Sequence, residues 1–245
     1  MHDPSASQRL GSLRRRWPVV GMALGVLATA LLLRLLLSSE SSEPSESSNR
    51  EDVRLTPVDP VGGMPLREVL AKRRSQRDFT DRALTLDEVA QLCWAAQGIS
   101  QKEQGFRTAP SAGALYPLTV LIVDREGVHE YLPQDHLLRS TRIGDLRLKL
   151  QAAALNQSSV GRAPVCFVIT MDVARTASKY GAKAERYCLL EAGHVAQNVL
   201  LQATSMGLGG VPIAAFDEHA VARLLQLPSR LQPVYLLPLG QPVGK

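Results

Sequence analysis

The chain has 245 residues, of which 45% are hydrophobic, enough for one globular domain with a sizeable core beside an N-terminal extension. Its formal net charge is +5, but five of the 28 Lys and Arg residues and only one of the 23 Asp and Glu residues fall within residues 1–37. The positive excess therefore belongs to the extension, and it does not indicate a nucleic-acid-binding domain. The three cysteines, Cys93, Cys166 and Cys188, lack metal-ligand spacing and lie in apolar segments, so we predict buried thiols and no metal site.

The extension contains an apolar run, residues 19–37, that is interrupted only by Arg34. As a helix this run would extend about 28 Å, close to the ~30 Å thickness of a bilayer core. We predict a single transmembrane anchor over 19–37 after a cytoplasmic segment, 1–18. Because three arginines, Arg14 to Arg16, precede the run, the positive-inside rule places the main domain outside the cytoplasm, at the cell membrane. A cleaved signal peptide is the alternative, because Ala28-Thr29-Ala30 resembles a cleavage site.

Residues 38–64 are rich first in Ser and Glu and then in Pro, which is typical of a flexible linker. Ahead of the apolar run, Arg15-Arg16-Trp17 weakly resembles a twin-arginine export signal, which would carry a protein that is already folded. The folded domain is expected to span residues 65–245.

Within this domain, helical periodicity and stop signals alternate irregularly with short apolar runs. A capping box, Thr85 to Glu88, starts one helix, and Gly98 ends it. The helix over 184–206 is apolar on almost every side, which favours burial in a core and at a subunit interface. We expect helices over about 65–74, 85–96, 143–155, 184–206 and 217–227, and strands over about 118–123, 128–131, 165–171, 210–214 and 234–239. Because no regular βαβ rhythm is present, the pattern predicts an α+β fold.

Three stretches carry residue types suited to ligand binding. Thr108–Pro117 packs small residues before a strand, which lets a backbone approach a flat ligand closely, although an ordinary loop explains it too. Lys72–Arg77 contains three guanidinium groups and a serine hydroxyl that could bind a phosphate. The alternative interpretation is a solvated basic helix end without a ligand. Met206–Asp217 is glycine-rich, but it lacks the pattern and the following helix of a dinucleotide site.

Taken together, these motifs resemble the nitroreductase-fold flavoproteins over residues 66–242, and within them most closely the SagB-type dehydrogenases that form thiazoles and oxazoles in peptides. The resemblance implies a nitroreductase-like α+β fold, with a central mixed or antiparallel sheet flanked by helices. It also implies a homodimer that binds FMN at the subunit interface, with the 108–117 loop reaching the cofactor largely from the partner. The FMN contacts that it implies are Arg73, Arg74, Ser75, Arg77, Pro110, Ser111, Ala112, Gly113, Pro212, Ile213 and Ala214.

Two positions depart from the family pattern. Many nitroreductases carry a Glu where this chain has Ala214, and a cation for the phosphate where it has Gln241. The terminal Lys245 is a possible substitute for that cation. In the long helix, Glu191, His194 and Asn198 share one face, and we interpret the histidine as a buried structural group rather than a zinc ligand or a catalytic group.

The resemblance therefore predicts a membrane-anchored, FMN-dependent oxidoreductase that oxidises azoline-like peptide substrates by hydride transfer to flavin N5. Lys179 and Tyr180 resemble the Lys-Tyr pair of SagB-type enzymes, which implies a catalytic role in proton transfer. One alternative is an NAD(P)H-dependent reductase of nitro or quinone compounds. A second is a flavin-binding module without catalysis. The expected partners are a second copy of the chain, the membrane, and a small-molecule or peptide substrate, without nucleic acid.

Overall fold

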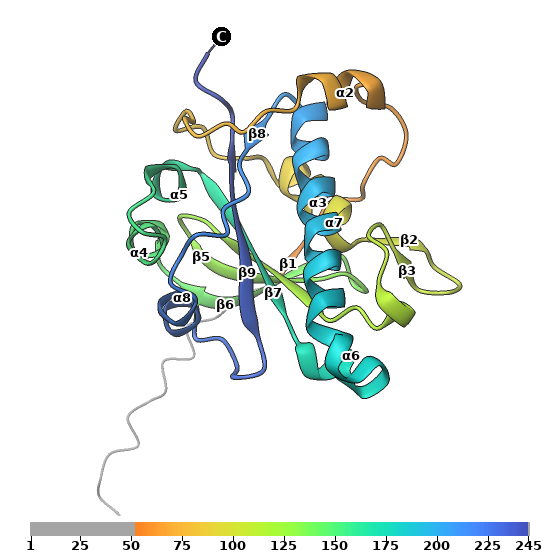
Figure 1. Cartoon of the computed structure of the whole chain (residues 1–245). Coiled ribbons are helices and arrows are strands. Elements are labelled where there is room, and N and C mark those ends of the chain that lie inside the picture. The colour runs from red at the N-terminus through yellow and green to blue at the C-terminus, as the bar shows by residue number, and fades with distance from the viewer. Residues whose placement is uncertain (1–51, 245) are drawn as a thin grey trace, which may run out of the picture. The chain divides into compact units, whose positions relative to one another are not determined.

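The structure, a computed structural model, describes residues 52–244 (Figure 1). The described part is built around one seven-stranded sheet in which every neighbouring pair of strands is antiparallel. In sheet order the strands are β1 (Val53–Arg54), β6 (Leu137–Ile143), β5 (Gly127–Leu132), β4 (Leu118–Val123), β7 (Val165–Met171), β9 (Gln232–Gly240) and β8 (Gly209–Gly210). A separate two-stranded sheet joins β2 (Ile99–Gln101) to β3 (Phe106–Arg107).

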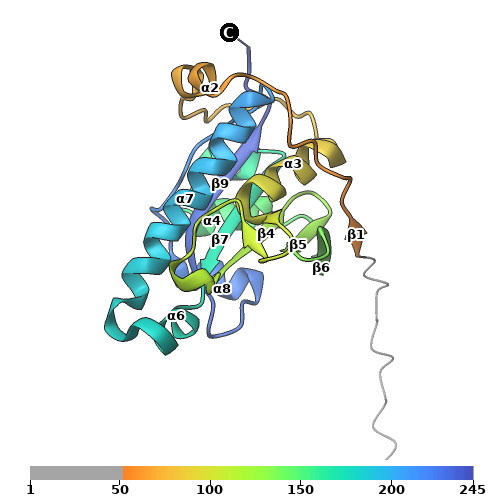
Figure 2. The same cartoon turned by 90° about the vertical axis from the view of Figure 1, so that its right-hand side faces the viewer.

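Helices cover both faces of the large sheet (Figures 1 and 2). On one face lie α3 (Leu86–Gln97) and α7 (Ala184–Ser205), with α2 (Leu66–Lys72) and α6 (Val173–Tyr180) packed against α7. On the other face lie α4 (Arg147–Ala153), α5 (Ser158–Arg162) and α8 (Glu218–Leu225). Two short 3-10 turns, η1 (Ala112–Ala114) and η2 (Gly181–Lys183), complete the list.

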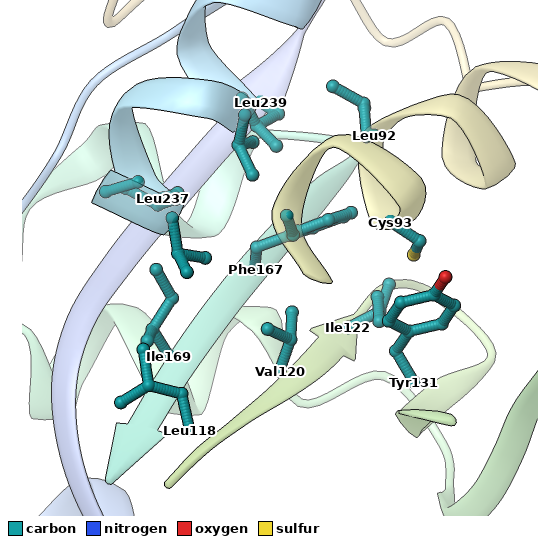
Figure 3. Packing of buried hydrophobic residues seen from close by; sticks show 14 of the residues in the cluster. Leu92, Cys93, Leu118, Val120, Ile122, Tyr131, Phe167, Ile169, Leu237 and Leu239 are labelled. Atoms are coloured by element: carbon teal, nitrogen blue, oxygen red, sulfur yellow. The ribbon is translucent and has the colours of Figure 1, made fainter. Parts of the chain in front are cut away.

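The centre of the sheet is apolar on both faces, since each face meets helices. Every residue of β7 is buried, and alternate side chains enter different cores. Phe167 and Ile169 pack toward α3 and α7 (Figure 3), whereas Cys166 and Val168 pack toward α4, α5 and α8. The continuous apolar sequence of this strand is therefore explained by its two covered faces.

The local signals read from the sequence are confirmed for most of these elements. The bounds of β4 and β7 are those expected, and Thr85 and Glu88 form the capping box of α3 in both directions. All three cysteines are free and buried, and burial raises the pKa of the Cys93 thiol. The fold is the α+β arrangement that was expected, with antiparallel pairing throughout the large sheet.

Several boundaries differ from expectation. The helix expected from residue 143 begins only at Arg147, because residues 137–143 form β6 and pair with β5. The helices α5 and α6 were not predicted. β1 pairs with β6 and Leu55 is buried, so the folded part reaches back into the range 38–64 that was expected to be linker.

The predicted membrane span at residues 19–37 lies outside the described residues. Within residues 52–244, no helix combines the length and the apolar character needed to cross a membrane.

Candidate functional site

The stretch that follows α2 lies directly beside β8, although more than a hundred residues separate them in sequence. Ser75 forms a parallel bridge with Gly210, and the amide of Gln76 donates to the carbonyl of Gly210 at 3.0 Å. At Gly209 an added Cβ would lie 2.7 Å from Cγ of Gln76, so this close approach requires glycine. The fold thus joins two of the stretches singled out in the sequence, and we call residues 73–77 with 209–214 the phosphate-side group.

The cations of this group are available to a ligand. Arg74 and Arg77 are exposed and Arg73 is half-buried. None of the three lies within ion-pair distance of a carboxylate in residues 52–244, and Arg74 donates only to the carbonyl of Arg73, at 2.7 Å. Unpaired guanidinium groups around exposed backbone are suited to a phosphate, which they bind bidentately.

The structure of residues 212–214 differs in part from the expectation that all three residues contact FMN. The side chain of Ile213 points into the core, and its amide and carbonyl both pair with Leu236 at 2.9 Å. Pro212 has no amide hydrogen. Within the described residues the amide of Ala214 takes part in none of the hydrogen bonds, and this residue is exposed. Of the three, only Ala214 therefore has a backbone donor free for a ligand.

Gln241, which stands where the resemblance implies a cation, is engaged. Arg82 donates to its side-chain oxygen at 2.7 Å and also forms an ion pair with Glu88 at 2.8 Å. A guanidinium group thus does lie beside position 241, but a carboxylate already neutralises it. Lys245 lies outside the described residues.

The second cluster of expected site residues is the loop over 110–116, and it contacts the Lys-Tyr pair. Gly113, Ala114 and Tyr116 have positive φ values of 63°, 54° and 48°. A Cβ at Gly113 would lie 2.9 Å from both Nζ of Lys179 and Oη of Tyr180, so the glycine lets these groups reach the loop. We call residues 110–116 with 179–180 the loop-side group.

A ring of half-buried polar contacts holds this loop in its strained conformation. The backbone amide of Tyr116 donates to Ser111 Oγ at 2.9 Å, and its side-chain hydroxyl accepts from the backbone amide of Arg107 at 3.2 Å. The guanidinium of Arg107 lies 4.4 Å above the Tyr116 ring and donates to Gln97 Oε1 at 2.6 Å. Glu191, on α7 and only 3% exposed, faces both Ser111 and Gln97 and closes the ring.

Glu191 is the unusual member of this ring. Burial raises the pKa of its carboxyl group, while Ser111, Gln97 and the charge of Arg107 offset part of that rise. Within residues 52–244, its Oε1 and the side-chain nitrogen of Gln97 are both buried without a hydrogen bond of good geometry. A neutral carboxyl group could donate a proton within the ring, which a carboxylate cannot.

Comparison with known proteins decides the family. Residues 70–241 match the sequence profile of the Nitroreductase family. The chain belongs to the Nitroreductase family. A relative in Methanocaldococcus jannaschii, named as a nitroreductase, is 39% identical over 184 residues, which cover 73% of this chain and 91% of that protein. The trifolitoxin operon protein TfxC of Rhizobium leguminosarum is 25% identical, and the match covers 81% of this chain but only 62% of TfxC.

Solved structures agree with this nitroreductase fold. A Ralstonia eutropha protein, also described as a nitroreductase, superposes with a TM-score of 0.73 at 28% identity, covering 81% of this chain and 92% of that one. The NADPH:FMN oxidoreductase of Vibrio harveyi gives a TM-score of 0.56 at 26% identity, covering 73% of this chain and 69% of that one. The protein is thus a flavin-dependent oxidoreductase of nitroreductase fold.

In a single copy of this chain, the two groups lie beside opposite ends of α7 (Figures 1 and 2). Gly210, in the phosphate-side group, approaches Leu200, whereas Tyr180 in the loop-side group stacks edge-on against Tyr187 at 5.0 Å. Thirteen residues of helix separate these two contacts, or roughly 20 Å. The structure therefore brings the expected residues together within each group but does not bring the two groups together.

Some site residues were not identified from the sequence. Gln97 reads as an ordinary residue at the end of α3, and Glu191 was noted only for the face that it shares with His194. That histidine was expected to be buried, but it is exposed, and Glu191 is the buried member. The available signal was an acidic residue among apolar neighbours on the core side of a long helix.

Proposed function

We propose that this chain works as a homodimer in which each FMN lies between the phosphate-side group of one copy and the loop-side group of the other. The observation that carries the proposal is the separation of the two groups along α7. In a two-fold symmetric dimer whose α7 helices run antiparallel, each end of one helix meets the opposite end of its partner. Two equivalent composite sites then arise from one contact.

The exposed face of α7 supports this arrangement. Leu189 and Leu190 are 45% and 52% exposed, and an added Cβ at Gly193 would meet no atom of the described residues within 4 Å. Apolar side chains beside a small residue, on the uncovered face of a helix, are suited to close packing against another helix. A second copy would bury them.

Within each composite site, the residues would divide the work. Arg73, Arg74 and Arg77 would bind the phosphate with the hydroxyl of Ser75, and the amide of Ala214 would donate to the ring edge. From the other copy, the stretch Pro110–Gly113 would approach the ring face. FMN is the flavin proposed because these unpaired cations suit a phosphate and because the Vibrio harveyi neighbour is an FMN oxidoreductase.

For the reaction, we propose oxidation of azoline rings in peptides to azoles. Bound flavin would accept the hydride that leaves the ring, with molecular oxygen restoring the cofactor. The Lys179–Tyr180 pair would take the proton that leaves at the same time, because it contacts the loop beside the ring. The likeness to a trifolitoxin operon protein and the motifs of the SagB type support this substrate class.

A second candidate is NAD(P)H-dependent reduction of nitro or quinone compounds. It is favoured by the 39% identity to the Methanocaldococcus jannaschii protein and by the NADPH-dependent neighbour. Anaerobic mixing of the flavin-loaded full chain with an azoline peptide or with NADPH separates the two. Bleaching of the flavin by the peptide supports the dehydrogenase, and bleaching by NADPH alone supports the reductase. If neither bleaches it, both proposals fail.

Subunit complementation tests the composite site. Arg73→Ala/Arg77→Ala removes the phosphate-side group, and Lys179→Ala/Tyr180→Phe removes the proton acceptor of the loop-side group. Each variant alone should be inactive, whereas co-refolded mixtures should regain about a quarter of the wild-type activity, since about half of the dimers carry one intact site. No recovery in mixtures shown to contain heterodimers would place the whole site within one chain.

We further propose that residues 19–37 anchor the protein to the membrane with its domain outside the cytoplasm. Carbonate extraction of membranes from cells expressing the full chain tests the anchor, and accessibility to added protease tests the side. Release of the protein into the soluble fraction would contradict the anchor.

A further inference from the structure

A small pocket of about 150 Å³ lies beside the loop-side group, between the 110–116 loop, α6 and the edge of β4 and β5. It is separate from the phosphate-side group. The polar side chains that line it include Arg107, Tyr116, Glu130 and Arg175.

Two guanidinium groups meet in this pocket on a single tyrosine. Arg107 lies over the Tyr116 ring at 4.4 Å, and Arg175 donates to the Tyr116 carbonyl at 2.9 Å. Neither arginine forms an ion pair within residues 52–244, and the Nε of Arg107 is buried without a hydrogen-bond partner. Burial lowers the pKa of Arg107, Tyr116 and Glu191 offset part of that lowering, and the charge of Arg175 adds to it. Within the described residues, these two like charges are held together without a carboxylate in ion-pair contact.

The acidic groups nearby form no ion pair with either arginine within residues 52–244. Glu130 lines the pocket, but its carboxylate is paired with Arg139 at 2.7 Å. The carboxyl group of Glu191 offsets part of the lowering of the Arg107 pKa, but it forms no ion pair with this arginine in the described residues. Both carboxyl groups still disfavour a ligand that carries two negative charges.

We propose that this pocket binds a carboxylate, held between the guanidinium groups of Arg107 and Arg175. A carboxylate is planar and singly charged, it matches the fork of an arginine, and its head fits the available volume. The polar ring fixes Arg107 in advance through Gln97 and Tyr116, so little side-chain entropy is lost on binding.

The carboxylate would belong to the substrate, a role that rests on the proposed function. Tyr116 belongs to the same loop as Gly113, which contacts Lys179 and Tyr180. A substrate anchored at the pocket by its carboxylate would thus extend toward the proposed reaction centre. Acidic residues or free carboxyl termini of peptides, and aromatic acids, all supply this group.

The binding test uses the full chain, with acetate as the probe and acetamide as its uncharged match, at constant ionic strength set with chloride. Acetate should raise the thermal midpoint in proportion to its occupancy, and acetamide should not. Arg175→Gln should weaken acetate binding about tenfold, as expected for the loss of a charge-assisted contact. Arg175 is exposed, so this variant should fold, and Arg223→Gln, an exposed arginine on α8, is the matched control.

Equal acetate responses in the wild type and Arg175→Gln would overturn the proposed carboxylate site, as would stronger binding of phosphate than of acetate.

A second, kinetic experiment compares 4-nitrobenzoate with 4-nitrobenzamide as substrates. The preference in kcat/KM for the carboxylate should fall about tenfold in Arg175→Gln but not in Arg223→Gln. If the chain reduces neither compound, the proposed reductase activity fails, while the acetate titration still decides the pocket.

Discussion

The two halves of the candidate site are built in different ways. The phosphate-side group is held by backbone pairing, since Ser75 and Gln76 pair with Gly210 and their side chains are not needed for that contact. The loop-side group is held by side chains, because the buried Gln97 and Glu191 close a polar ring around a strained loop. The backbone arrangement of the first should therefore tolerate many substitutions outside its glycines, and that of the second should respond to single polar changes that leave its volume intact.

The largest effect is expected where the two halves must meet. Leu190→Arg places a charge on the exposed face of α7, so the dimer should dissociate and flavin affinity should fall more than a hundredfold, because neither half alone encloses the cofactor. Sedimentation measures the dissociation of the dimer, and flavin absorbance measures the affinity for flavin. Leu148→Arg, at a 73% exposed leucine on α4, is the control and should change neither. A monomeric Leu190→Arg variant that keeps its flavin would show that one chain holds the whole site.

Within the phosphate-side group, charge rather than packing should determine cofactor affinity. Arg73→Ala should lower FMN affinity about tenfold or more, since it removes a charge-assisted contact to the phosphate. Riboflavin, which lacks the phosphate, should bind the variant and the wild type equally. Arg67→Ala, at an exposed arginine on α2, the helix that ends just before Arg73, serves as the control for a general loss of positive charge. Equal loss for both flavins would mean that Arg73 does not bind the phosphate.

The backbone pairing of the same group should be sensitive to a single methyl group. In Gly210→Ala the new Cβ would lie 2.5 Å from a methyl carbon of Leu239 and 3.0 Å from the carbonyl oxygen of Pro238. Overpacking of this kind costs about 1–3 kcal/mol of unfolding free energy, which urea titration measures. Gly244→Ala, with nothing within 4 Å, should be unchanged. An equally stable Gly210→Ala variant would show that β8 can shift at no cost.

The same contrast explains what the sequence could reveal. Local signals specified β4, β7 and the capping box of α3, because periodicity and cap chemistry act within a few residues. They missed β6, where Leu137 and Leu138 are followed by four polar residues and only pairing with β5 makes a strand. For the site, the arginine and glycine motifs were recognisable as linear patterns. The partnership of Gln97 with Glu191 was not, since it exists only where α3 and α7 pack together.

The smallest predicted effect probes that partnership. The folded-state pKa of Glu191 is raised, so its stabilising contribution is complete below its ordinary value of 4.5 and is lost as the pH rises through the folded-state value. In Glu191→Gln the amide keeps the shape but cannot ionise. The unfolding free energy of the variant should therefore improve relative to the wild type as the pH rises from about 4.5 toward neutrality, by about 1.4 kcal/mol for each unit by which the pKa is raised. Urea titrations across this range measure the difference. Parallel pH profiles for the wild type and Glu191→Gln would mean that the ring already accommodates a carboxylate, which the charge of Arg107 stabilises. The loop-side group would then depend on charge, as the phosphate-side group does.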